Sequence, residues 1–271
     1  MAADFDTIIR TPPSGRRTAV LIDHHQYAQA VILQTRPIPW TDPIAYSQFL
    51  GQAQGLLRPD TTLLDLGAFY QHAIAEDESL RSSLSARSRA GYALKTLLAA
   101  EKPALAAREL AEVISQTTRM PLIVQVPSPM LWLAQTHTLS GAGEVTELDS
   151  DHAENAAMYV ADWLRRLSDL QVSMLLLDER RTGSAELPDV DDVERDAYLP
   201  VTNVTDHYRW TLGRRTGDEL TVRGSTFTGT PVPAEYWLSE DATAPIGDFL
   251  VAEIPANAVP ETVLAQLAKL A

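Results

Sequence analysis

The sequence predicts a mixed α/β fold, namely a (βα)8-type TIM barrel that is trimmed or irregular and carries a helical insertion. Short apolar runs alternate with helix-forming segments, and about seven or eight of these runs have the character of strands. Alternation of this kind favours a mainly parallel sheet. The 271 residues leave little room for an insertion, because eight complete βα units need about 250 residues. We expect residues 1–17 to form a flexible N-terminal arm and residues 18–271 to form a single α/β barrel domain.

Four runs have the apolar, β-branched character of buried strands. They are residues 18–23, 61–66, 121–126 and 172–178. A helix is predicted over 43–57, because Asp42 is a suitable N-cap and Pro43 suits the first turn of a helix. The stretch 68–118 is rich in helix-forming residues with a partly apolar face, and it is the predicted insertion.

The second half of the chain continues with helix followed by strand. Asp151 precedes a helix predicted over 152–169, and the strand 172–178 follows after a short turn, which is half of a parallel βαβ unit. Residues 198–203 are interpreted as a strand or a loop that leads into a helix over 204–213. The remaining predictions are strands over 219–223, 236–238 and 249–254 and a terminal helix over 261–270.

The charge and the apolar pattern exclude several kinds of partner. The chain has 36 acidic and 22 basic residues and a formal net charge of −14, so we expect no nucleic-acid partner. No apolar run approaches the ~20 residues of a membrane span, and the N-terminus lacks the apolar segment of a secretory signal. We therefore expect no membrane partner and a cytoplasmic location, and we leave a homo-oligomer open.

Cofactor and metal motifs are missing from the sequence. There is no cysteine, which excludes disulfides and thiolate metal ligands. No glycine-rich phosphate loop and no serine-hydrolase elbow occurs. His24 and His25 are adjacent, so on a strand they would point to opposite faces. We expect neither a metal nor another cofactor, while ligation through His24, His207 and nearby carboxylates stays an alternative.

Polar side chains follow several of the predicted strands at the point where each strand ends. In a parallel α/β sheet these ends form the ligand-binding edge, so we expect the side chains to face a common cavity. The candidate catalytic residues are Asp23, His24, Asp178, Glu179 and His207. The candidate substrate-binding residues are Tyr27, Asp65, Gln125, Asn203, Tyr208 and Trp210. A polar cavity of this kind, with apolar walls, favours acid–base chemistry.

Each candidate also has a purely structural interpretation. Asp23 could belong to a strand-end turn and His24 could be a core imidazole. The Asp178-Glu179 pair could cap the next element, and packing alone would explain Trp210. Asp65 lies in an apolar run, so it is either bonded to backbone at the rim or active in a pocket.

Parts of the chain resemble a known barrel superfamily. The stretch 121–129, the helix 152–169 and the run 172–179 resemble uroporphyrinogen decarboxylase and cobalamin-independent methionine synthase over roughly the middle half of the chain. In that superfamily a strand gives a substrate-facing turn, a helix follows, and a later strand ends in an Asp-Glu pair, which is Asp178-Glu179 here. The segments 38–42 and 198–204 are similar in character.

The resemblance implies a barrel enzyme of one of two kinds. The methyltransferases of the superfamily hold zinc with histidine and cysteine, and this chain has no cysteine. The decarboxylase branch needs no metal and uses arginine and aspartate in its cleft. Arg16, Arg17 and Asp23 would be the matching residues here.

The leading hypothesis is a metal-independent, lyase- or decarboxylase-like enzyme that acts on a small organic acid or carbonyl compound. Asp23 or His24 would transfer the proton, with Asp178 or Glu179 as its charged partner. His207 and Tyr208 would orient the substrate, and Asn203 and Gln125 would hold it by hydrogen bonds. The alternatives are a methyltransferase or metal-assisted enzyme on the same barrel, and a non-catalytic binding or accessory subunit.

Overall fold

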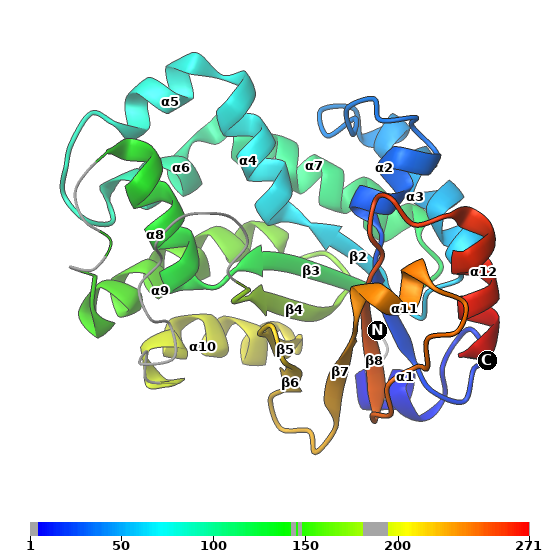
Figure 1. The fold of residues 1–271 in the computed structure, drawn as a ribbon. Helices are drawn as coiled ribbons and strands as arrows, with labels where there is room; N and C mark the ends of the chain where they lie inside the picture. The colour runs from blue at the N-terminus through cyan, green and yellow to red at the C-terminus, as the bar shows by residue number, and fades with distance from the viewer. Residues whose placement is uncertain (1–4, 142–144, 146–147, 181–194, 271) are drawn as a thin grey trace.

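The computed structural model of the chain describes residues 5–141, 145, 148–180 and 195–270. Over these residues, eight strands form one sheet in the order β1-β8-β7-β6-β5-β4-β3-β2. The two outer strands β1 and β2 face each other, and the Asp60 amide next to β2 donates to the Val20 carbonyl of β1 at 3.0 Å. The sheet is therefore a nearly closed barrel (Figure 1), which confirms the predicted α/β barrel fold.

The strand directions explain the irregularity of the barrel. The strands are β1 Val20–Asp23, β2 Thr62–Asp65, β3 Leu122–Pro127, β4 Val172–Asp178, β5 Thr211–Arg215, β6 Leu220–Val222, β7 Thr228–Val232 and β8 Phe249–Glu253. All neighbours pair in parallel except β6, which is antiparallel to β5 and to β7. The carboxyl ends of all strands but β6 consequently meet at the same end of the barrel.

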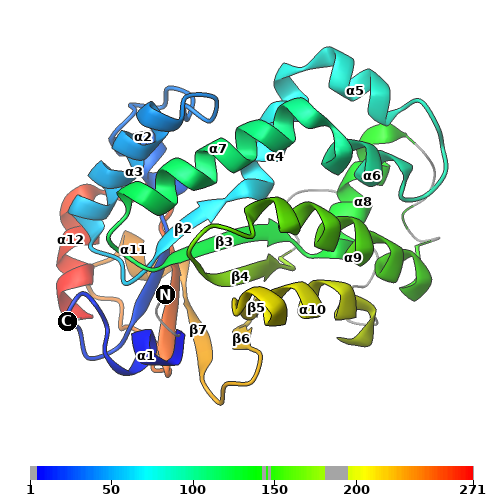
Figure 2. The ribbon, with the colours of Figure 1, turned by 180° about the vertical axis from the view of Figure 1, so that it is seen from behind.

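Helices surround most of the barrel (Figures 1 and 2). They are α1 Phe5–Arg10, α2 His25–Val31, α3 Pro43–Leu57, α4 Leu66–Glu76, α5 Glu78–Leu84, α6 Tyr92–Ala99, α7 Glu101–Thr117, α8 Pro129–Ser140, α9 Ser150–Leu164, α10 Leu199–Tyr208, α11 Ala234–Leu238 and α12 Pro260–Lys269. The insertion predicted over 68–118 is confirmed: α4 to α7 separate β2 from β3, and α5 and α6 stand away from the sheet at the upper left of Figure 1. Among the helices described, none is both long and apolar enough to cross a bilayer.

Alternate residues of the strands fill the interior of the barrel. They form one buried cluster that contains Leu21, Leu63, Ile123, Met174, Leu176, Leu220, Val222, Phe249 and Val251. The interior is packed so closely that a Cβ on Gly229 of β7 would lie 2.5 Å from the Phe249 ring. Because side chains alternate along a strand, the positions two residues beyond these apolar ones also point inward.

Residues 5–17 differ from the flexible arm expected over 1–17, of which residues 1–4 lie outside the described part. Helix α1 lies at the end of the barrel opposite the carboxyl ends of the strands (Figure 1). Its residues Phe5, Ile8 and Ile9 are buried in the interior cluster, and the rings of Phe5 and Phe249 meet edge to face with centroids 5.5 Å apart. The arm is thus the apolar floor of the barrel, because burial of three large side chains favours order over chain entropy.

Ile8→Val is expected to reduce the free energy of unfolding by about 0.5 to 1.5 kcal/mol, the usual cost of deleting one buried methylene group. The matched control is Ile44→Val, since Ile44 is 60% exposed and the same substitution there should change stability by less than about 0.5 kcal/mol. Urea unfolding followed by circular dichroism measures both. Equal effects at the two positions would show that α1 does not belong to the core.

The C-terminal third departs most from the sequence predictions. Residues 198–203 are not a strand, since the helix α10 begins at Leu199, and the helix predicted over 204–213 overlaps the strand β5. The segment 236–238 lies in the helix α11 rather than in a strand. Its aromatic residues favour strands in general, but here Tyr236 and Trp237 are buried against a separate cluster that includes α12.

Two strands have no counterpart among the predictions. The strand β5 carries Arg214 and Arg215, which do not fit the pattern of a buried strand. The strand β7 contains Gly229 and Pro231, residues that argue against a strand interior. Both nevertheless pair with neighbours over their length, because the closing sheet supplies partners on either side.

Candidate active site

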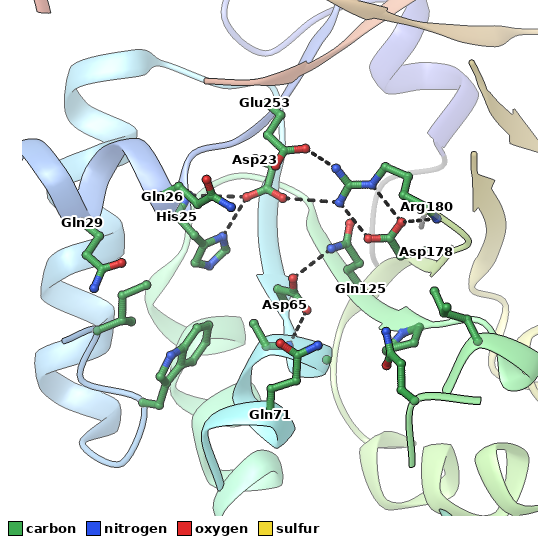
Figure 3. Close-up of a pocket in the computed structure, with 17 residues that line it drawn as sticks. Asp23, His25, Gln26, Gln29, Asp65, Gln71, Gln125, Asp178, Arg180 and Glu253 are labelled. Carbon is green, nitrogen blue, oxygen red and sulfur yellow. Dashed lines mark hydrogen bonds and ion pairs between the residues drawn. The ribbon is translucent and has the colours of Figure 1, made fainter. Parts of the chain in front are cut away.

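The carboxyl ends of the strands surround a cavity of about 280 Å³ (Figure 3). Each of the strands that supply its charged and amide groups places a polar side chain two residues beyond an apolar interior residue. Asp23 follows Leu21, Asp65 follows Leu63, Gln125 follows Ile123, Asp178 follows Leu176 and Glu253 follows Val251. The same alternation that builds the core therefore delivers these groups to one cavity.

Uncharged groups make up much of the remaining wall. Amide side chains come from Gln26, Gln29, Gln71 and Gln135, and apolar contacts come from Ile38, Trp40, Pro127 and Leu131. Amides supply hydrogen-bond donors and acceptors without charge. The wall is thus suited to a polar ligand with an apolar face.

Asp65 has the environment of a carboxyl group with a perturbed pKa. It caps α4, where its Oδ1 accepts the Ala68 amide at 2.9 Å, and its Oδ2 accepts the Gln125 amide group at 3.0 Å. Burial, and then the negative charge of Asp23, raise the pKa of Asp65 to about 6. Asp65 therefore exchanges a proton close to neutral pH.

Asp23 has the opposite environment, because it belongs to a chain of hydrogen bonds. Its Oδ1 lies 3.0 Å from Nδ1 of His25, whose Nε2 lies 2.8 Å from the Tyr46 hydroxyl. Burial opposes ionisation of Asp23, but the hydrogen bond and charge of His25 and the charge of Arg215 outweigh it and hold the pKa of Asp23 well below its usual value. Burial likewise opposes the charge on His25, yet Asp23 raises the pKa of His25.

Tyr46→Phe is expected to lower the free energy of unfolding by about 1 to 3 kcal/mol, because Nε2 of His25 would stay buried without its partner. His25 also stacks on Trp40, with ring centroids 5.6 Å apart, so the imidazole cannot turn toward another partner without losing that contact. The control is Tyr92→Phe on α6, a half-buried tyrosine outside the cavity. Urea unfolding gives the free energy of unfolding of both variants. A loss of stability in Tyr46→Phe no larger than in Tyr92→Phe would contradict the prediction.

Arg180 is held by three carboxylates. Its Nε and Nη2 donate to the two oxygens of Asp178 at 2.9 and 2.7 Å, and its Nη1 donates to Glu253. Asp23 lies further away, with Oδ2 3.9 Å from Nη2. Burial opposes the charge, but the hydrogen bond and charge of Asp178 and the charge of Glu253 outweigh it and raise the pKa of Arg180. The charge of the Arg180 guanidinium is therefore balanced by carboxylates of the protein itself.

Gln125 leaves one hydrogen-bonding atom open. Its Nε2 donates to Asp65, while its carbonyl oxygen Oε1 is buried and has no partner within the described residues. A buried acceptor without a donor is costly, of the order of 1 to 3 kcal/mol. The open acceptor points to a ligand or solvent group that donates a hydrogen bond at this position.

The structure brings Asp23, Asp65, Gln125 and Asp178 of the sequence candidates together at the cavity. Of the adjacent histidines it is His25 that lines the cavity. His24 is 1% exposed and is not among the lining residues, its Nδ1 lies 3.2 Å from the Ile22 carbonyl, and burial lowers its pKa to about 4. Its Nε2 has no partner in the described structure.

Glu179 points away from the cavity. It follows Asp178 directly, so it has the opposite direction along the strand. Its carboxylate accepts from Nε and Nη2 of Arg214 at 3.1 and 2.9 Å. Arg16 lies at the seam between β1 and β2, where it donates to the Arg58 carbonyl and pairs with Asp60, and Arg17 is exposed.

The candidates on and around α10 do not reach the cavity either. Asn203, His207 and Tyr208 line a separate groove with Met158 of α9. Trp210 is packed in the core outside the barrel, and Tyr27 on α2 is packed in the cluster that includes Trp237. These residues were grouped with the site because they are close in sequence. The helix α10, however, covers the outside of the sheet.

The candidate catalytic and binding residues chosen from the sequence did not include His25, Arg180 or Glu253, although His25 and Arg180 belong to polar clusters at the ends of predicted strands. The spacing from Val251 to Glu253 could have identified Glu253, since it repeats the period of the other strands. His25 and Arg180 lie beyond the strand ends, where no period fixes the direction of a side chain. Only the fold places them.

Among the described residues, no group of three or more histidine, aspartate and glutamate side chains is arranged to hold a metal ion. The fold and the cavity define an α/β barrel with a charged and amide-rich pocket at the carboxyl ends of its strands. No protein-family model, no curated protein and no solved structure matches the chain. A function is therefore inferred from the side chains that line the cavity.

Proposed function

We propose that the chain is a lyase-like enzyme that acts on a small carbonyl compound by general acid–base catalysis with its own side chains. One observation carries the proposal: Asp65 and Asp23 face the same cavity in opposite environments. Two carboxyl groups whose pKa values are pushed apart are a common sign of acid–base chemistry. Here the pKa of Asp65 is raised to about 6, and that of Asp23 is lowered.

Asp65 is the proposed proton-transfer group. At neutral pH it is mostly ionised, so it accepts a proton from the carbon next to the substrate carbonyl or from a substrate hydroxyl, and its acid form returns the proton to the product. Gln125 orients the Asp65 carboxylate through its 3.0 Å hydrogen bond. Asp23 stays ionised, and its charge keeps the proton affinity of Asp65 high.

The cavity supports a small and polar substrate. Its volume of about 280 Å³ is near the lower end of the range of about 300 to 1,000 Å³ for small-molecule sites. The open carbonyl oxygen of Gln125 favours a substrate hydroxyl or amide as donor. Trp40, which is stacked on His25, offers an apolar surface to the other side of the ligand.

Within the superfamily, we propose a relationship to the decarboxylase branch. The arginine of that branch would correspond to a residue of the cavity rather than to Arg16 or Arg17. Asp23 and Arg180 are the aspartate and arginine that face the proposed substrate. The methyltransferase or metal-assisted alternative has less support, because no suitable ligand group occurs in the described residues.

Proton transfer can be tested before the natural substrate is identified. A panel of small oxo compounds is incubated with the protein in D₂O, and ¹H NMR follows the exchange of hydrogen next to the carbonyl. We expect exchange of at least one compound above the buffer rate with the native chain, and loss of that exchange with Asp65→Asn. Exchange that persists in the variant would contradict the role of Asp65. Binding of ligands without any exchange or cleavage would favour a non-catalytic binding subunit.

A further inference from the structure

A second cavity, of about 350 Å³, adjoins the first. Gln26, Arg180 and Glu253 line both cavities, so the two cavities meet at these side chains. On its far side the second cavity is lined by Arg215 and Thr216 at the end of β5 and by residues of β7. A ligand in the first cavity therefore has a polar space next to it, behind the Arg180–Glu253 pair.

The two arginines that line the second cavity differ in how many of their N–H donors have an acceptor. Arg180 directs three of its nitrogen atoms at carboxylates. Arg215 is 5% exposed and makes one side-chain hydrogen bond within the described residues, from Nη2 to Glu253 at 3.3 Å. Its Nη1 lies 3.8 Å from Asp23, beyond hydrogen-bonding distance. A guanidinium has five N–H donors, so most of those on Arg215 have no acceptor among the described residues.

The electrostatic environment of Arg215 agrees with this geometry. Burial, and then the charge of Arg180, lower the pKa of Arg215 despite the nearby acids. Glu253 is already shared, because it also accepts from Arg180. Arg215 is therefore a buried cation without a full set of acceptors in the described part of the chain, and it borders a cavity large enough for a small group.

We propose that Arg215 binds a carboxylate group of the substrate in the second cavity. This inference rests on the proposed function for the reacting end, and it narrows the substrate class to oxo- or hydroxycarboxylic acids whose reacting carbon lies beside Asp65. A carboxylate matches the planar fork of a guanidinium.

The charges around Arg215 favour a carboxylate over a phosphate. Arg180 and Arg215 face three carboxylates, namely Asp23, Asp178 and Glu253, so this group of side chains already carries one excess negative charge. A single negative charge on the ligand is therefore better tolerated here than the double charge of a phosphate.

The test uses 4-oxopentanoate as the probe and its uncharged methyl ester as the comparison, with binding measured by saturation-transfer NMR on the full chain. The native chain should bind the acid and not the ester. Arg215→Gln should weaken binding of the acid by roughly 10- to 100-fold, the loss expected for a charged hydrogen-bond partner. Arg223→Gln is the control, because Arg223 is an exposed arginine paired with Asp206, and it should bind as the native chain does.

A second variant tests the same cavity in case Arg215→Gln does not fold. Ala234 lines the second cavity from an exposed position at the start of α11, so Ala234→Phe narrows the cavity without removing a charge. We expect it to weaken binding of the acid as well, with an unchanged melting temperature. The inference is overturned if both variants bind the acid as the native chain does, if the ester binds equally well, or if inorganic phosphate displaces the probe at a lower concentration than acetate.

Failure of this inference can be told apart from failure of the proposed function. The binding measurement needs no chemistry, and Asp65→Asn keeps Arg215 and the second cavity. Native binding by Arg215→Gln together with lost exchange in Asp65→Asn would remove the carboxylate subsite alone. Weakened binding in Arg215→Gln, with no exchange by the native chain, would keep the subsite and remove the proposed reaction.

Discussion

Asp65→Asn is expected to lower the rate of the proposed proton transfer by about 100- to 10,000-fold, the usual contribution of a positioned acid–base group. The native pH–rate profile should have a limb near pH 6, which corresponds to the pKa of Asp65, and the variant should lack it. The matched control is Asp77→Asn, because Asp77 also caps a helix but lies outside the cavity. Equal loss of activity in both variants would show that capping, rather than proton transfer, is the role of Asp65.

The asparagine should fit without disturbing the fold. Its oxygen can still accept the Ala68 amide that Asp65 now accepts. Its amide group would face Gln125, which can turn its own side-chain amide and present Oε1, the atom that now has no partner in the described residues. A loss of activity in this variant would therefore reflect chemistry rather than unfolding.

Asp65 also makes stability depend on pH in a defined direction. Its pKa is about 6 in the folded state and about 3.9 in an unfolded chain. The folded state thus holds the proton more tightly, so the contribution of Asp65 to stability is fully present below about pH 4 and is lost as the pH rises through 6. Unfolding free energies of the native chain and of Asp65→Asn should differ by about 2 to 3 kcal/mol more at pH 8 than at pH 4, in favour of the variant.

Asp60→Ala is the substitution with the largest expected effect on stability. Asp60 is fully buried between the ends of β1 and β2. Its Oδ1 accepts the Ser14 amide and its Oδ2 accepts the Val20 amide, both at 2.8 Å, and Arg16 lies 3.8 Å from Oδ2. Alanine would leave two amides and a partly buried cation without their acceptor, which should cost about 3 to 5 kcal/mol.

The control for Asp60 is an aspartate that accepts one amide at the surface. Asp248 is exposed and accepts the Thr228 amide at 2.9 Å, so Asp248→Ala should cost no more than about 1 kcal/mol. Urea unfolding of both variants gives the comparison. A loss below about 1 kcal/mol for Asp60→Ala would mean that other contacts close the seam between β1 and β2.

Sequence patterns predicted six of the eight strands, and most clearly those that are uninterrupted apolar runs. The strands β1 to β4 are buried on both faces, so they stand out as continuous runs of Val, Ile and Leu. The strands β5 and β7 do not, because they contain arginines, glycine and proline whose cost is offset by pairing within the closed sheet. The floor helix α1 was missed for a similar reason: a short polar segment with three apolar residues acquires order only through the barrel that it closes.

The candidate site was predictable where strand geometry alone determines direction. Asp23, Asp65, Gln125 and Asp178 each lie two residues beyond an interior side chain, and the same rule separates Asp178 from Glu179. It gives no information on His25 and Arg180, which follow the strand ends. Their directions depend on tertiary partners, namely Tyr46 for His25 and Glu253 for Arg180.

The layered interior has a consequence for how such a chain can diverge. The apolar interior, which α1 completes, consists of side chains other than those of the polar ring above it. Single substitutions in that ring can thus change specificity while the folded scaffold persists, as long as buried charges remain paired. Descendants of one ancestral barrel could acquire different chemistries in this way and keep a common foundation.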